Sequence, residues 1–180
     1  MKQQELLTQL AKRAKVEPKA IDSPLQGKNR LGYRRAARIG INQRETGELL
    51  IGFRRRNSSK LVDIEQCPVL TPGINDLLAD LRSTLEQFDR IKHLTQIELV
   101  EGESGVVAEL RATKNLSDEL RAALTDLAQQ HRADFVLSVK EGAKTKLNAN
   151  PAATELELAK SLNLEFSARD FVQVNSEVNE

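Results

Sequence analysis

The sequence predicts an α+β protein with a mainly antiparallel sheet and a few covering helices. The first observation is that several short segments alternate apolar and polar residues, as strands with one buried face do. The second is that most of these segments follow one another through short turns rich in Gly, Asn or Ser. The third is that longer segments between them carry apolar stripes at helical spacing.

The first third of the chain predicts a helix, a linker and a three-stranded meander. Leu and Ala recur at helical spacing in residues 3–14, and the linker over residues 16–30 contains prolines and a glycine. Three strands are then predicted in order along the chain, at residues 33–42, 49–54 and 61–64. In the first of them Arg34 and Arg38 alternate with apolar residues, so both point to one face of the sheet.

The middle of the chain predicts two helices around a hairpin. Thr71 and Pro72 open the first helix as N-cap and first helical residue. Residues 96–100 and 106–111 predict two strands joined by a glycine-containing turn. Ser117 is placed as the N-cap of the second helix.

The last part of the chain predicts a strand at residues 135–139 and a hairpin at residues 156–166. Residues 142–153 between them are polar and rich in residues that break regular structure, which predicts a flexible loop. We expect the whole chain to form one domain, with possible subdomains at residues 1–70 and 71–180.

Charge is strongly segregated along the sequence. The segment from Lys28 to Lys60 contains ten basic and two acidic residues, whereas the whole chain has a net charge of +1. Most of these basic residues are Arg, whose planar guanidinium suits phosphate and stacks on nucleobases. This pattern is typical of a nucleic-acid partner. The alternatives are a solvated charged face, or arginines paired with the chain's own carboxylates.

The composition excludes several classes of protein. With 39% hydrophobic and 29% charged residues, the chain has the composition of a globular protein and not of a disordered one. No segment approaches the ~18 apolar residues of a membrane helix, and the first residues lack a secretory apolar core. A single cysteine, Cys67, excludes an internal disulfide and fits a reducing compartment. We therefore expect a cytoplasmic protein without a membrane partner.

Catalytic motifs are absent from the sequence. It contains no glycine-rich nucleotide loop and no zinc-protease motif. Four glutamates gather around the turn of the predicted hairpin, at positions 98, 101, 103 and 109, and favour a solvated hairpin over a catalytic carboxylate pair. Taken alone, Cys67 is typical of a small buried side chain.

Three stretches carry a family resemblance. They are GYRRAAR at residues 32–38, GFRRRNSSKLVDIEQCPVL at residues 52–70 and DFVQVN at residues 170–175. Together they resemble the central domain of bacterial RNA uracil-5-methyltransferases, and most closely the branch that methylates 23S ribosomal RNA and carries an iron–sulfur cluster. The first stretch departs at Ala36, where the family usually has another basic residue.

The resemblance implies a part of a larger enzyme. Such enzymes carry an N-terminal β-barrel domain, a cysteine triad and a C-terminal domain that binds S-adenosylmethionine and holds the catalytic residues. Cys67 would be the fourth ligand of a 4Fe-4S cluster in the parent. We expect that this chain is an excised domain with none of these other parts. It would therefore bind no cofactor and be inactive alone, whereas the parent methylates uridine C5 in ribosomal RNA.

The resemblance and the charge pattern together nominate site residues. Arg34, Arg35, Arg38, Arg54, Arg55, Arg56 and Lys60 are candidates for RNA binding. The resemblance places Phe171, Gln173 and Asn175 in the pocket for the flipped-out uridine and the cofactor, where a ring can stack and an amide can read the base.

Three alternatives remain open from the sequence. One is a stand-alone RNA- or ribosome-binding module, and another is a relative of transfer RNA uracil-5-methyltransferases. The third is a protein-interaction domain whose arginine face meets an acidic partner.

Overall fold

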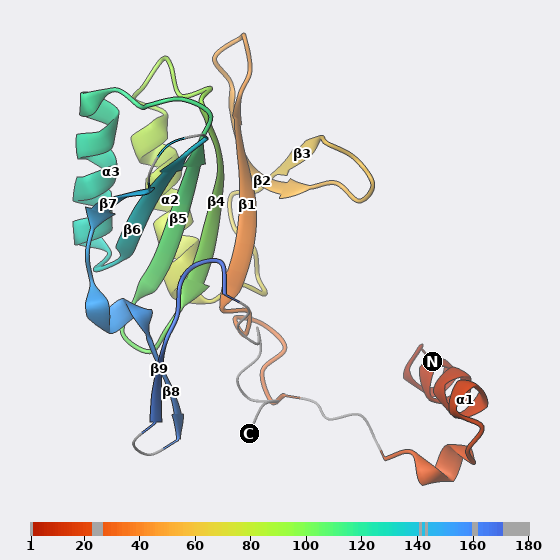
Figure 1. Cartoon of the computed structure of the whole chain (residues 1–180). Coiled ribbons are helices and arrows are strands. Elements are labelled where there is room, and N and C mark those ends of the chain that lie inside the picture. Colours follow the sequence, from red (N-terminus) through yellow and green to blue (C-terminus); the bar gives the residue numbers. More distant parts are fainter. Residues whose placement is uncertain (1, 23–26, 141, 143, 160–161, 171–180) are drawn as a thin grey trace.

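The computed structural model describes residues 2–22, 27–140, 142, 144–159 and 162–170 of the 180-residue chain. Its centre is a seven-stranded sheet with the strand order β3-β2-β1-β4-β5-β6-β7 (Figure 1). The strands are β1 (Ala36–Gln43), β2 (Leu49–Arg54), β3 (Leu61–Asp63), β4 (Leu94–Glu101), β5 (Val106–Ala112), β6 (Asp134–Val139) and β7 (Lys144–Asn148). The predicted α+β class with a mainly antiparallel sheet is confirmed.

The sheet is antiparallel except at one pair of strands. β5 and β6 pair in parallel, and the helix α3 (Asp118–Gln130) connects them, because parallel neighbours need a long crossover. The Ser117 hydroxyl accepts a hydrogen bond from the Leu120 amide at 3.3 Å, which confirms Ser117 as the N-cap. The second covering helix, α2 (Pro72–Leu85), begins with proline directly after Thr71, as predicted.

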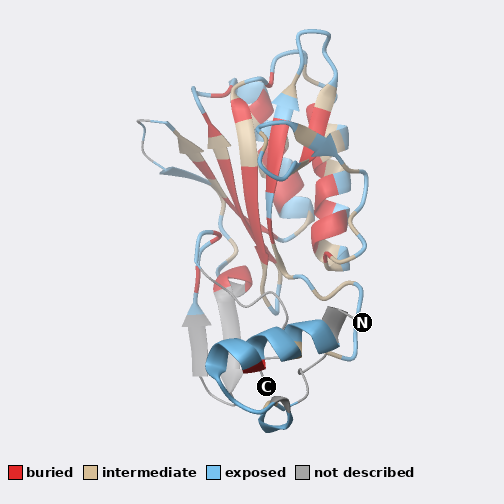
Figure 2. Ribbon diagram, turned by 90° about the vertical axis from the view of Figure 1, so that its right-hand side faces the viewer, coloured by how far each residue is buried: buried red, intermediate tan, exposed pale blue. Residues whose placement is uncertain are grey.

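Both helices cover the same face of the sheet, and the core lies between them and the strands (Figures 1 and 2). Apolar side chains alternate along each central strand toward the helices, for example Ile39 and Ile41 on β1 and Ile97 and Leu99 on β4. The intervening side chains point to the opposite face. At one end of that face Val100 and Val107 are buried under Ala153, Phe166 and Ala168. The rest of it, in the described part of the chain, carries no helix. We call this the open face.

The prediction of a flexible loop at residues 142–153 is wrong. This segment contains β7 and most of the short 3-10 helix η2 (Pro151–Thr154). Lys144 and Lys146 occupy alternate positions on β7, and Leu147 packs against the core. The polar strand is held because both lysines pair with buried carboxylates, at 2.9 and 3.1 Å. A polar edge strand thus has the composition of a loop.

The remaining elements lie outside the seven-stranded sheet. Helix α1 (Lys2–Ala14) confirms the predicted N-terminal helix and stands apart from the sheet in Figure 1, with Leu6 and Leu10 exposed. A 3-10 turn, η1 (Pro18–Ala20), follows it. Strands β8 (Glu155–Ala159) and β9 (Leu162–Glu165) form the predicted C-terminal hairpin. No helix in the described residues is long and apolar enough to cross a membrane.

Candidate nucleic-acid interface

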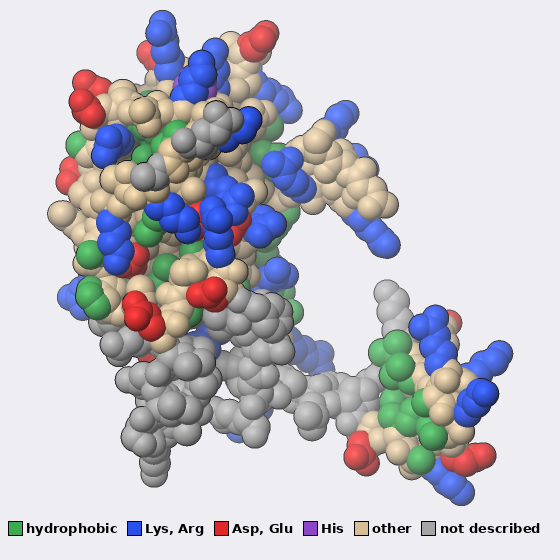
Figure 3. All heavy atoms as spheres, viewed as in Figure 1, with side chains coloured by type: hydrophobic (Ala, Val, Ile, Leu, Met, Phe, Trp, Pro, Cys, Tyr) green, Lys and Arg blue, Asp and Glu red, His purple; other side chains and the backbone are tan. Residues whose placement is uncertain are grey.

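The connection between β2 and β3 presents the densest group of basic side chains. We call residues 49–63 the arginine hairpin, and it projects from the edge of the sheet (Figure 1). Arg54, Arg55, Arg56 and Lys60 are all exposed, and Figure 3 shows basic side chains around this projection. The Arg54 guanidinium donates to the Ser59 carbonyl at 3.2 Å, whereas the other three side chains have no partner among the described residues. These three cations are therefore available to a ligand.

The base of the arginine hairpin is fixed firmly to the body. The Arg82 guanidinium, on α2, donates to the Asp63 carboxylate at 2.7 Å and to the Ile64 carbonyl at 3.0 Å. The Asp63 carboxylate also accepts from the Ile51 amide at 2.7 Å. A side chain at Gly52 would place its Cβ 1.8 Å from the Val62 carbonyl oxygen, so only glycine fits. The exposed arginines thus extend from a rigid base.

A groove lies between the arginine hairpin and the open face of the sheet. It encloses about 590 Å³. Its basic walls are Arg44, Arg54 and Lys60, and uncharged polar and aliphatic side chains complete the lining. Leu61 rests over Gly40, where a Cβ would lie 2.4 Å from a Leu61 methyl carbon. Arg44 is paired with Glu48 at 2.6 Å, which leaves Arg54 and Lys60 as the cations without an acidic partner among the described residues. A groove with these two cations and apolar walls can accept a phosphate together with a nucleobase or ribose.

The other three predicted RNA-binding residues differ in how accessible they are. Arg34 is exposed, although its Nε donates to the Ala36 carbonyl at 2.9 Å. Arg35 is only 14% exposed and pairs with Glu103 at 3.1 Å. Arg38 is 69% exposed and pairs with Glu98 at 3.2 Å on the open face. The structure therefore brings Arg38 onto the sheet face, while Arg35 is largely occupied by its own partner.

The open face carries charged residues that the sequence analysis missed. Glu98 and Glu109 were expected on a solvated hairpin, but they face each other in register across β4 and β5 and are buried. Arg38 and Arg111 both approach Glu98 at 3.2 Å. Lys144 donates to Glu109 at 2.9 Å, and Arg169 also pairs with Glu109. Their alternation with core residues along β1, β4 and β5 could have placed these charged residues on one face of the sheet, but it could not have shown that Glu98 and Glu109 are buried there.

Glu109 is ionised in this environment. Burial raises the pKa of Glu109, but hydrogen bonds from Lys144 and Arg169, together with their charges, outweigh burial and bring the pKa below its ordinary value. The buried carboxylate therefore remains a full negative charge at neutral pH, able to hold two cations.

The loop that contains Cys67 is held by a buried amide. The Asn75 side chain accepts from the Cys67 amide at 3.0 Å and donates to the Cys67 carbonyl at 3.1 Å. The Asn75 side chain also donates to the Leu70 and Thr71 carbonyls. Cys67 itself is half-buried and packs against the core. The backbone of Cys67 is therefore held in place by the Asn75 amide.

The chain's own residues do not complete a cluster site. A 4Fe-4S cluster is held by four cysteine thiolates, and this chain has one cysteine. Among the described residues no group of three or more His, Cys, Asp or Glu could hold a metal ion. The predicted pocket residues Phe171, Gln173 and Asn175 lie outside the described residues.

Comparisons with known proteins identify relatives by sequence. No family model matches the chain. The 23S rRNA (uracil(1939)-C(5))-methyltransferase RlmD of Vibrio parahaemolyticus is 33% identical over 178 residues, which cover 98% of this chain and 40% of that protein. The protein of the same name from Erwinia tasmaniensis is 36% identical over 83% of this chain and 34% of its own length. The chain thus spans two-fifths or less of the curated relatives it matches.

The fold has a solved counterpart. The structure aligns with that of Pyrococcus abyssi tRNA (uracil-54, C5)-methyltransferase in complex with S-adenosyl-L-homocysteine, with a TM-score of 0.56 and 19% identity. The alignment covers 85% of this chain and 40% of that one. This likeness supports the fold alone, while the sequence relatives confirm the predicted family resemblance. By its sequence relatives the chain belongs to the RNA uracil-C5-methyltransferase family, and it corresponds to a part of their length.

Proposed function

We propose that this chain is the RNA-binding part of a 23S rRNA (uracil-C5)-methyltransferase. The observation that carries the proposal is an identity of 33% over 98% of the chain with such an enzyme. The exposed cations of the arginine hairpin support a role in RNA binding. In this proposal the whole protein acts in the cytoplasm, where ribosomal RNA is its partner.

The predicted residues divide into two roles. The four basic residues of the arginine hairpin, with Arg34 and Arg38, bind phosphates and splayed bases. Arg35 supports this surface through its pair with Glu103. Phe171, Gln173 and Asn175 contribute to the target-uridine pocket once the catalytic domain is present.

Two groups belong to the whole protein in this proposal. S-adenosylmethionine supplies the methyl group that uridine C5 receives, and other domains hold it. Cys67, fixed by Asn75, supplies one thiolate to a 4Fe-4S cluster whose other ligands come from outside this chain.

The test uses the complete protein that contains this chain. Methyl transfer from tritiated S-adenosylmethionine to 23S rRNA is measured for the unaltered protein and for the Gln173→Ala and Arg54→Ala variants. We expect Gln173→Ala to lower turnover at saturating RNA, because Gln173 acts on the extruded base. We expect Arg54→Ala to raise the RNA concentration required, with turnover nearly kept.

Two outcomes would contradict the proposal. If the complete protein methylates no uridine, the chain is part of an RNA-binding protein and not of a methyltransferase. If methylation is found on transfer RNA and not on ribosomal RNA, the substrate assignment is wrong. Mass spectrometry of nucleosides from each RNA separates these cases.

A further inference from the structure

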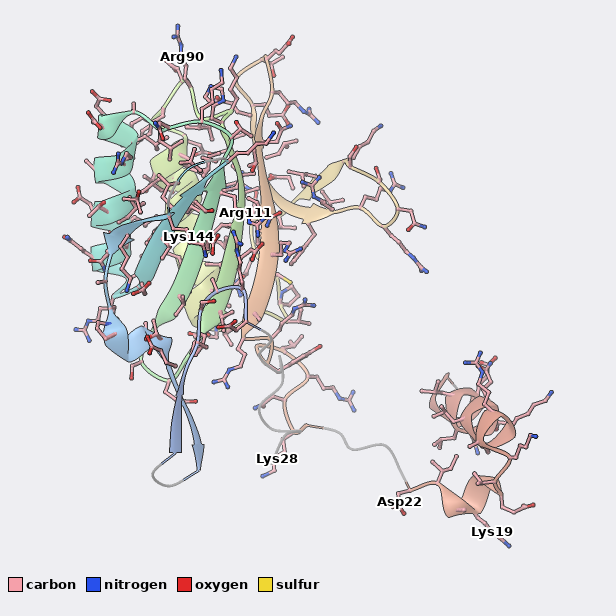
Figure 4. All side chains as sticks on the ribbon, in the orientation of Figure 1. Lys19, Asp22, Lys28, Arg90, Arg111 and Lys144 are labelled. Carbon is pink, nitrogen blue, oxygen red and sulfur yellow. The ribbon has the colours of Figure 1, made fainter. Side chains whose placement is uncertain are left out.

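Five cationic side chains stand on the open face of the sheet above three buried carboxylates. The cations are Arg38, Arg111, Lys144, Lys146 and Arg169, and their side chains are 39–69% exposed. The carboxylates beneath them, those of Glu98, Glu109 and Asp134, are 3–4% exposed. Figure 4 shows Arg111 and Lys144 on the face turned toward the viewer, and Figure 3 shows basic side chains gathered there.

This arrangement differs from ordinary surface ion pairs. In an exposed pair both charges meet solvent and the pair presents little net field. Here the negative charges are buried and the positive ones meet solvent, with two cations in excess. A buried carboxylate is costly unless it is paired, so each of the three carboxylates fixes the head groups that neutralise it. An approaching ligand therefore meets a positive surface whose side chains are already ordered.

Glu98 is the clearest case of such ordering. One of its oxygens accepts from Gln96 at 2.7 Å and lies 3.2 Å from both Arg38 and Arg111. The Nε–H of Arg111 is buried and has no partner among the described residues, so it is not the donor that meets a ligand. The two guanidiniums share one anchor, and because each carries several N–H donors and is partly exposed, donors remain for a further acceptor.

The register places these cations in a row across the sheet. Arg38 on β1 lies opposite Glu98 on β4, Glu98 lies opposite Glu109 on β5, and Lys146 on β7 lies opposite Val136 on β6. Neighbouring strands are about 4.8 Å apart, so the row extends roughly 20 Å from β1 to β7. That length spans several phosphates of an extended strand.

The row also leads to the groove beside the arginine hairpin. On β1, Arg38 is followed by Gly40 and Asn42 on the same face, and Asn42 lines the groove beside the arginine hairpin. Arg169 pairs with Glu109 on β5, in the middle of the row. On its β1 side the row therefore continues into the groove beside the arginine hairpin.

We propose that an RNA strand crosses the open face, its phosphates bound by these five cationic side chains, which the buried Glu98, Glu109 and Asp134 hold in position. This deepens the proposed function and rests on it. Charge selects the occupant, because a surface with two excess cations and ordered guanidiniums suits a chain of phosphates. The three carboxylates are positioning residues that act through the cationic side chains above them.

The experiment measures binding of the 180-residue chain to a fluorescein-labelled RNA stem-loop over a range of salt concentrations. Arg111→Ala should weaken binding roughly three- to tenfold and reduce the salt slope by about 0.7, as expected for one lost phosphate contact. The matched control is Arg121→Ala on α3, which covers the opposite face, and it should leave affinity and slope unchanged.

Glu98→Gln gives the sharper test, because a net-charge effect and a positioning role predict opposite changes in RNA affinity. Removing a negative charge strengthens RNA binding if only net charge matters. If Glu98 positions the two arginines, Glu98→Gln weakens binding, and Glu98→Asp retains part of it. In an Arg38→Ala/Arg111→Ala background, Glu98→Gln should cause no further loss. Thermal unfolding of each variant verifies that it is folded before binding is compared.

The outcomes separate the two proposals. If the unaltered chain does not bind RNA, both proposals are overturned. If the chain binds RNA, but Arg111→Ala has the same affinity and salt slope as Arg121→Ala, the RNA strand does not cross the open face. In that case only this inference fails. Tighter or unchanged binding by Glu98→Gln overturns the positioning role. Displacement of the RNA by poly-glutamate at equal charge would show that the face suits an acidic protein instead.

Discussion

Glu109→Gln should destabilise the chain at neutral pH and have almost no effect in acid. Gln keeps the shape of the side chain but loses the charge that holds Lys144 and Arg169. Hydrogen bonds to charged groups contribute ~1.5–3 kcal/mol each. Lys144 and Arg169 are half-exposed, and solvent screening lowers the contribution of each pair, so we expect a total loss of about 2 kcal/mol, below the sum for two fully buried bonds. In a domain of this size that lowers the unfolding midpoint by roughly 4–8 °C.

The sign of the pH dependence follows from the lowered pKa of Glu109. In the folded protein this carboxyl loses its proton more readily than in the unfolded chain, where its pKa is ordinary, near 4.5. Its contribution to stability is therefore complete above that ordinary value and is lost as pH falls through the lowered folded value. At low pH a protonated Glu109 resembles Gln, so the two proteins converge.

The assay is thermal unfolding followed by circular dichroism at about pH 7 and about pH 3. Glu103→Gln is the control, because Glu103 is 58% exposed and its pair with Arg35 should contribute at most about 1 kcal/mol. Equal midpoints for Glu109→Gln and the unaltered chain at neutral pH would refute the reasoning. So would a difference that persists or grows in acid.

Three further predictions concern the arginine hairpin and the cysteine loop. Replacing Arg55, Arg56 and Lys60 together by Ala should reduce the magnitude of the log–log salt slope of RNA binding by about 2, since each contact contributes roughly 0.7; an unchanged slope in a fluorescence titration would exclude these side chains. Gly52→Ala should lower the unfolding midpoint and speed hydrogen exchange in β3, because its Cβ would lie 1.8 Å from a carbonyl oxygen, whereas Gly142→Ala, 3.4 Å from its nearest neighbour, should not. Anaerobic reconstitution with iron and sulfide should leave Cys67 alkylatable, because three further thiolates are required; stoichiometric iron in a monomer would contradict this.

The sequence predicted the fold class and most elements because their signals are local. Alternation identified the meander and the central hairpin, and Thr71-Pro72 and Ser117 marked the starts of the two covering helices. Strand β7 was missed because its residues are mostly polar and show no apolar alternation, although it pairs with the preceding strand β6. Lys144 and Lys146 look like loop residues until the fold places Glu109 and Asp134 beneath them.

The candidate site was predictable only in part for the same reason. The arginine hairpin could be located because four basic residues follow one another closely along the chain. The burial of Glu98 and Glu109 could not, because it depends on strand order and on which face the helices cover. Charge counts along the sequence also cannot tell that Arg35 is occupied by Glu103 while Arg38 remains largely exposed.

The layering of acids beneath bases has a practical consequence for purification. With a formal net charge of +1, the chain would be expected to bind weakly to any ion exchanger near neutral pH. A resin, however, contacts only the outermost layer of a protein, and on the open face that layer is cationic. The chain should therefore be retained on heparin or phosphocellulose and elute only at raised salt, behaving in chromatography as a much more basic protein than its composition indicates.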